Sequence, residues 1–256
     1  MKKTLPALLL FIFISLSSTS ASADSKSDYE YQLSQYRRSY TEFTQLKRDY
    51  LQNRTLDNQQ KSIIIAKQAL LARDLAKAAY ARYLTDLITQ HNTNYVGFES
   101  TLTRLSSAVS FYTLNSTRSQ AIATPADLKT FSDEYVLASI IPDRSFYYGQ
   151  EAAKLAQLIR FHLDAQKIFD SIRPKITQDG QPIPLKARLQ EIPILAEEIN
   201  QKIATQAALI IPKVEEKPIS GNDYFSEKIK TLTQIRSLQT ELVDLLVDID
   251  LNYAQL

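Results

Sequence analysis

An uninterrupted stretch of 35 residues, Asp57 to His91, constrains the fold of this chain more than any other part of its sequence. The stretch contains neither Gly nor Pro, so it predicts one continuous helix roughly 50 Å long. Its apolar side chains recur at steps of three and four and cover a broad side of that helix: Ile63, Ile64, Leu70, Leu71, Leu75, Ala78, Ala79, Tyr83, Leu84, Leu87 and Ile88. A side this wide requires neighbouring helices in more than one direction.

The same periodicity recurs along the rest of the chain. It predicts further helices at about 28–53, 94–119, 125–141, 143–172, 185–210 and 225–253. Only four Gly occur in 256 residues, which argues against a turn-rich β fold. The sequence therefore predicts an all-α fold, an elongated antiparallel helical bundle or helical-hairpin coiled coil of about six to seven helices.

Several helix boundaries have local signals. Asp57 and Gln60 have the spacing of a capping box, in which each side chain satisfies a backbone donor at the helix start. Thr124 and Pro125 predict a helix start with a Thr cap and a Pro where its missing N–H costs nothing. Pro142 is expected to end or kink the helix that begins at Pro125.

The stretch 174–184 contains three prolines and an Asp-Gly turn, and it is the best candidate for a linker. We expect a single elongated helical domain over 24–256, with a possible sub-boundary at 174–184. Pro193 interrupts the next helix but stands beside its apolar row, so a bend that preserves the row is expected. That row is Leu185, Leu189, Ile192, Ala196, Ile199, Ile203, Ala207 and Ile210.

The first 23 residues have the pattern of a secretory signal peptide. Lys2 and Lys3 precede an apolar run, and Ala21-Ser22-Ala23 matches a cleavage site, so the mature protein is expected to begin at Asp24. The run is shorter than the about 20 apolar residues that span a membrane. No Cys follows it, so a lipid anchor is not expected. The predicted location is secreted or periplasmic.

Charge and cysteine content exclude several functions. Lys2 and Lys3 supply the whole formal charge of +2, so the mature chain is neutral and a nucleic-acid partner is not expected. With no Cys in the chain, disulfides and thiol chemistry are excluded.

No motif for catalysis was found. The only two His, His91 and His162, have no carboxylate or second His at ligand spacing, so no metal site is predicted. The Gly residues lie too far apart for a phosphate-binding loop, and no nucleophile-elbow pattern occurs. We therefore expect no catalytic residues, no cofactor and no enzymatic activity.

Two aromatic groups remain as a possible interaction patch. Phe146, Tyr147 and Tyr148 follow one another near an expected bend, and Tyr36 and Tyr40 belong to the aromatic row of the first helix. Exposed aromatic clusters often mark binding sites. Rings that fill the end or the edge of a helical bundle are the simpler interpretation.

These observations favour an exported, non-catalytic helical scaffold or protein-interaction protein that presents long coiled-coil-like surfaces. Its partner would be another protein or a second copy of the chain. One alternative is an extracytoplasmic bundle, a sensor or carrier, that holds a small apolar molecule in a cavity lined by residues 66–81. A membrane-active helical protein is a further alternative, although the chain lacks a long apolar hairpin.

Overall fold

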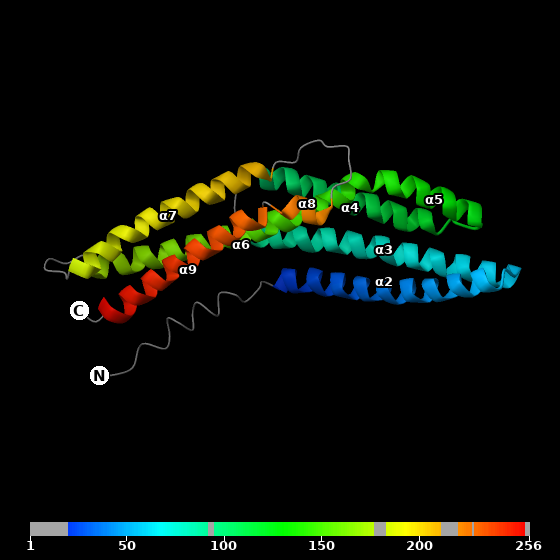
Figure 1. Cartoon of the computed structure of the whole chain (residues 1–256), viewed down its shortest axis with the longest axis horizontal. Coiled ribbons are helices and arrows are strands. Elements are labelled where there is room, and N and C mark those ends of the chain that lie inside the picture. Colours follow the sequence, from blue (N-terminus) through cyan, green and yellow to red (C-terminus); the bar gives the residue numbers. More distant parts are fainter. Residues whose placement is uncertain (1–19, 92–94, 177–182, 211–219, 227, 254–256) are drawn as a thin grey trace. The chain divides into compact units, whose positions relative to one another are not determined.

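The structure, a computed structural model, describes residues 20–91, 95–176, 183–210, 220–226 and 228–253 (Figure 1). Every regular element in these ranges is a helix, which confirms the predicted all-α helical bundle. The helices are α2 (Ser20–Gln52), α3 (Leu56–Gln90), α4 (Val96–Ser119), α5 (Pro125–Ala138), α6 (Ile140–Ile176), α7 (Ile183–Leu209), α8 (Gly221–Phe225) and α9 (Lys228–Tyr253). Residues 1–19 of the expected signal peptide lie outside the described part.

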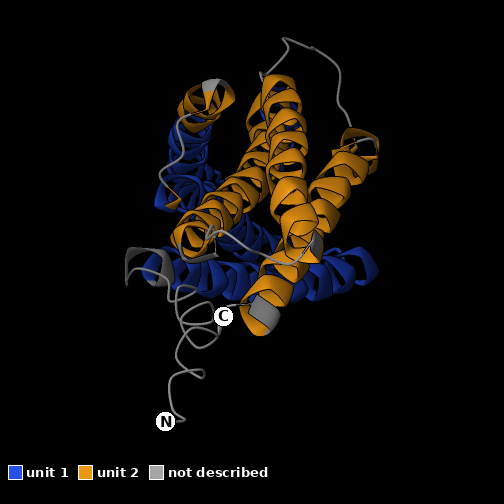
Figure 2. Cartoon of the chain, turned by 90° about the vertical axis from the view of Figure 1, so that its left-hand side faces the viewer, with its two compact units in different colours: residues 1–90, 105–139 blue, residues 91–104, 140–256 orange. Residues whose placement is uncertain are grey.

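The chain divides into two compact units (Figure 2). Unit 1 comprises residues 1–90 and 105–139, and unit 2 comprises residues 91–104 and 140–256. The stretch 174–184, where a sub-boundary was expected, lies within unit 2, and its residues 177–182 are outside the described part. The organisation as a single elongated domain stays a prediction.

In unit 1, α2 and α3 run antiparallel as a helical hairpin (Figure 1). Ser62 on α3 donates a hydrogen bond to the Leu46 carbonyl of α2 at 3.2 Å. The core side of α3 consists mainly of small residues: Ala66, Ala69, Ala72, Ala76, Ala78, Ala79 and Ala81, followed by Leu84 and Ile88. Of the broad side expected from the sequence, Ala78, Ala79, Leu84 and Ile88 are buried, whereas Ile64 is 55% exposed and the other members are half-buried.

The start of α3 differs from the prediction. The residue that caps it is Thr55, whose hydroxyl accepts a hydrogen bond from the Asn58 N–H at 3.2 Å. Asp57 lies in the first turn and forms an ion pair with Lys61 at 2.6 Å. The predicted Asp57–Gln60 capping box is therefore wrong by two residues. Thr and Asp are both good N-cap residues, so residue type alone does not decide between them. The conformation of the preceding turn does.

The start of α5 confirms its prediction. Thr124 accepts a hydrogen bond from the Asp127 N–H at 3.1 Å, and the Asp127 carboxylate accepts one from the Thr124 N–H at 2.9 Å. Pro125 occupies the first turn. Pro142 does not end α5, because α5 already stops at Ala138 and α6 begins at Ile140. Pro142 thus lies in the first turn of α6, where no helical hydrogen bond is lost.

In unit 2, α6, α7 and α9 each contact the other two (Figure 1). The expected apolar row of α7 is largely buried, and it meets a corresponding row of α9; the buried members are Leu185, Ile192, Ile199, Ile203, Ala207 and Ile210 with Ile235, Leu242, Leu245 and Ile249. Pro193 lies inside α7 with its ring exposed. Within the described ranges, no helix has the length and apolar content that a membrane span requires.

Candidate functional site

The three consecutive aromatic residues of α6 pack inside unit 2. Phe146 and Tyr148 are buried and Tyr147 is half-buried. The Tyr147 ring stacks on Tyr224 of α8 at 5.5 Å between centroids, and the Tyr148 ring meets the same Tyr224 edge-on at 5.3 Å. These rings therefore hold the short helix α8 against α6, and Tyr147 alone retains appreciable contact with solvent.

A buried carboxylate lies one turn further along α6. The Glu151 side chain is fully buried and accepts hydrogen bonds from three groups: Gln206 of α7 at 2.6 Å, the Tyr224 hydroxyl, and Lys228 at the start of α9 at 2.5 Å. Lys228 also donates to the Tyr224 hydroxyl at 2.9 Å. One carboxylate thus connects α6, α7, α8 and α9.

Tyr224 and Lys228 supply the buried Glu151 carboxylate with a hydroxyl donor and a positive charge. Burial raises the pKa of the Tyr224 hydroxyl, and the adjacent Glu151 carboxylate raises it further, so Tyr224 remains a proton donor. Lys228 supplies the opposite charge and lies 4.1 Å from the centre of the Tyr224 ring. Three donors, one of which is the Lys228 cation, compensate the burial of the Glu151 carboxylate.

The sequence contained a signal for this network that the prediction missed. Glu151 follows Tyr148 by three residues and precedes Leu155 by four, so it lies on the apolar row of its own helix. An acid in such a row requires buried partners. Its partners are 55 to 77 residues away along the chain, and periodicity does not identify them.

Unit 1 contains a comparable buried acid, Asp74 on α3. Its carboxylate accepts hydrogen bonds from Arg73 at 2.9 and 3.2 Å. The Arg73 guanidinium lies 3.6 Å from the centre of the Tyr135 ring of α5, and Lys77 donates to the Tyr135 hydroxyl at 3.1 Å. Burial raises the pKa of Asp74, while Arg73 and Lys77 oppose that rise. The arrangement joins α3 to α5.

Neither His is placed in a metal-binding group. Burial lowers the pKa of His162, and the Asn200 side chain acts in the opposite direction. Burial also lowers the pKa of His91, with a further contribution from Arg160. Among the described residues, no group of three or more His, Asp or Glu side chains is arranged to hold a metal ion.

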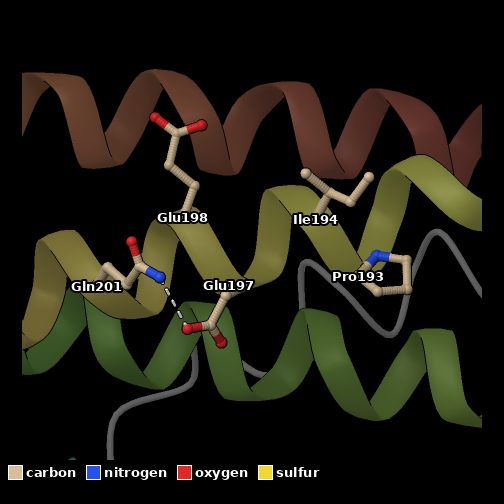
Figure 3. Close-up of a pocket in the computed structure, with 5 residues that line it drawn as sticks. All are labelled: Pro193, Ile194, Glu197, Glu198 and Gln201. Atoms are coloured by element: carbon tan, nitrogen blue, oxygen red, sulfur yellow. Dashed lines mark hydrogen bonds between the residues drawn. The ribbon is translucent and has the colours of Figure 1, made fainter.

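Two hollows lie on unit 2. One is a shallow depression of about 480 Å³ along α7, where Gln201 donates to Glu197 at 3.0 Å (Figure 3). The other, of about 410 Å³, lies between α6 and α7 and has Phe169, Ile192 and Asn200 among its lining residues. Neither hollow is lined by residues 66–81, where a ligand cavity was expected.

The hairpin has a long surface that is incompletely covered. From Asp24 to Ile65, all of which the structure describes, no side chain is buried. Tyr36 is half-buried and Tyr40 is 53% exposed, and their ring centroids are 5.8 Å apart. Leu51 and Leu56, on either side of the turn, are also exposed. Of the five residues predicted to form an interaction patch, Tyr36 and Tyr40 thus lie on this surface of unit 1, and Phe146, Tyr147 and Tyr148 belong to unit 2.

Comparisons with known protein families, with characterised proteins and with solved structures found no match for this chain.

Proposed function

We propose that this protein is a non-catalytic helical scaffold that binds another protein chain through α2 and the first part of α3. The observation that carries this proposal is the absence of any buried side chain between Asp24 and Ile65, a stretch the structure describes completely. Two helices packed only on each other leave part of each apolar face in water. A further helix would cover that face, as in a three- or four-helix bundle.

The composition of the hairpin supports the same proposal. Apolar residues recur along it at helical spacing, yet each remains exposed or half-buried: Tyr29, Leu33, Tyr36, Tyr40, Phe43, Leu46, Tyr50, Leu51, Leu56, Ile63, Ile64 and Ile65. A helix whose only role is to span solvent would not require this row. Tyr is also favoured at protein interfaces, since its ring is apolar and its hydroxyl remains hydrated.

We also propose that the protein acts outside the cytoplasm, as its N-terminal sequence predicts. Removal of residues 1–23 would leave α2 intact from Asp24 to Gln52. The intact mass of the exported protein tests this proposal. A mass that begins at Asp24 supports export, and a mass that begins at Met1 contradicts it.

Site-specific photo-crosslinking tests the interaction. A photoreactive amino acid at Tyr40 should yield a crosslink to a protein in the native host, whereas the same group at the exposed Ser132 of α5 should yield none. A product of twice the chain mass would identify a second copy, and any other mass would identify a different protein. The proposal fails if position 40 yields no more protein crosslink than position 132.

The hollow between α6 and α7 favours a second candidate function, binding of a small molecule. Its volume of about 410 Å³ is within the usual range of ligand sites, and apolar and polar side chains both line it. Native mass spectrometry of the protein purified from its host tests this function. A retained small molecule that Asn200→Leu abolishes would support it, and a ligand-free mass would contradict it.

A further inference from the structure

The free side of α2 consists of a regular row of residues. One row of α2, through Tyr29 and Tyr36, is half-buried, and Tyr29 contacts Tyr80 and Tyr83 of α3. The neighbouring row, called here the outer row, is Glu30, Leu33, Arg37, Tyr40, Thr44, Lys47 and Leu51. Leu33 is half-buried and all other members of the outer row are exposed. The steps of the outer row alternate between three and four residues, which is the spacing of a coiled-coil seam.

We propose that the outer row pairs antiparallel with the same row of a second copy of this chain. This inference rests on the proposed function and names the partner. Two α2–α3 hairpins related by a two-fold axis would then form a four-helix assembly. The axis would pass between residues 38 and 39, near the middle of α2.

The residues of the outer row match when the row is reversed against itself. In an antiparallel pair of identical helices, the two residue numbers of every facing pair have the same sum. One such register places Glu30 opposite Lys47, Leu33 opposite Thr44, and Arg37 opposite Tyr40. A two-fold axis repeats each of these pairs, so the interface contains every match twice.

Each facing pair is chemically favourable. Glu30 and Lys47 carry opposite charges, and the exposed contact of Glu30 with Lys26 at 3.6 Å is weak enough to be exchanged. Arg37 meets the face of Tyr40, an arrangement that Arg73 and Tyr135 already form within unit 1. Leu33 and Thr44 form the uncharged layer between these two pairs.

The charge distribution of α2 favours the antiparallel orientation. Glu30 and Lys47 of the outer row carry opposite charges and lie on opposite sides of the proposed axis. Antiparallel pairing brings Glu30 of each copy against Lys47 of the other, whereas in-register parallel pairing brings Glu30 against Glu30 and Lys47 against Lys47.

Cysteine crosslinking of the purified full chain tests partner, orientation and register together. The chain has no Cys, so each introduced thiol is unique. A mixture of Glu30→Cys and Lys47→Cys chains should form a disulfide-linked heterodimer on mild oxidation. Either variant alone should not crosslink, because its two thiols would lie about 25 Å apart along the helices.

A matched control uses the opposite side of the same helix. Gln35 and Glu42 have the same sum as Glu30 and Lys47 but lie away from the outer row. A mixture of Gln35→Cys and Glu42→Cys chains should therefore crosslink at least tenfold less. Equal crosslinking of both mixtures would contradict the proposal, as would efficient crosslinking of Glu30→Cys alone, which indicates a parallel pair.

Charge reversal in sedimentation experiments provides an independent test. Glu30→Lys and Lys47→Glu should each weaken dimerisation by about tenfold, since both copies of the pair become repulsive. The double variant Glu30→Lys/Lys47→Glu restores opposite charges and should recover most of the affinity. A monomer at every concentration, with unchanged helical circular dichroism, would overturn self-pairing. The proposed function would still stand if Tyr40 crosslinks to a different protein.

Discussion

Single buried ionisable residues hold distant helices together in this protein. Glu151 and Asp74 are both fully buried carboxylates on long helices. The network of Glu151 includes Tyr224 and Lys228, which lie more than 70 residues later in the sequence. The network of Asp74 includes Lys77 of the same helix and Tyr135 of α5. A buried charge is stable only when its partners are in place. The two networks therefore select one arrangement of helices rather than adding much net stability.

Replacement of Glu151 tests this role. Glu151→Gln keeps the size of the side chain but leaves Lys228, whose side chain is only 18% exposed, without its counter-charge. We expect a loss of about 3 kcal/mol in the free energy of unfolding, measured by urea denaturation. Asp133→Asn is the matched control, because it removes the carboxylate of the exposed pair with Lys129 and should cost less than about 0.5 kcal/mol. Equal losses would show that burial is irrelevant to the Glu151 pair.

The two His residues predict how stability depends on pH. Burial lowers the folded-state pKa of His162 and of His91 below the unfolded value. On acidification the unfolded chain therefore binds protons before the folded chain does. Stability should be fully present above the unfolded pKa of about 6.5 and should fall as the pH decreases from there toward the folded values.

This pH effect can be assigned to His162 by substitution. Between pH 7.5 and 5.5, His162→Leu should reduce the decrease in unfolding free energy by about 1 kcal/mol relative to the unmodified protein. The double variant His162→Leu/His91→Gln should reduce this decrease further, since these are the only two His in the chain. A stability that rises on acidification would contradict the lowered pKa values.

At the scale of helices, local signals determine several boundaries and packing determines others. The cap of α5 depends on residues within four positions of one another, Thr124 and Asp127. Thr124→Ala should lower the unfolding free energy by about 1 kcal/mol, and Thr124→Ser should preserve it, because Ser provides the same acceptor. Chemical denaturation of the three proteins measures the difference, and an unchanged midpoint for Thr124→Ala would contradict a stabilising cap.

Close contact between α4 and α7 depends on Gly97. A Cβ at this position would lie 3.0 Å from the Ala207 carbonyl oxygen and 3.2 Å from the Ile210 Cβ. We expect Gly97→Ala to destabilise the protein by about 2 kcal/mol, although Ala favours helices more than Gly does. Gly221→Ala is the control, since its Cβ would be 3.4 Å from the Tyr147 ring, an ordinary contact. Thermal unfolding compares the two, and a stabilised Gly97→Ala variant would refute the close approach.

For the whole molecule, the hairpin surface predicts that stability depends on concentration. If two copies pair through α2, dimerisation stabilises the folded state by mass action. The unfolding temperature should then rise by a few degrees over a hundredfold increase in protein concentration, as measured by scanning calorimetry. The Glu30→Lys variant should need about tenfold more protein to reach the same unfolding temperature, and an unmodified protein with a constant unfolding temperature would argue against a stable dimer.

Much of the fold could be predicted from the sequence, but less of the candidate site. The row of α7 from Leu185 to Ile210 and the cap at Thr124 were predicted because their interactions repeat within a few residues. Tyr148 is buried against Tyr224, which lies more than 70 residues later in the sequence. Glu151 was missed for the same reason, although its place on an apolar row could have signalled it.

By itself, the amino-acid sequence determined that the chain forms long helices, because helical propensity, periodic apolar residues and caps act between neighbours in the chain. Only the tertiary structure decided which sides of those helices are covered. Ala78 is completely buried while the larger Ile64 on the same helix is 55% exposed, because burial depends on which helix packs there rather than on the hydrophobicity of the residue. The uncovered side of α2, the basis of the proposed function, became visible only once α3 was in place beside it.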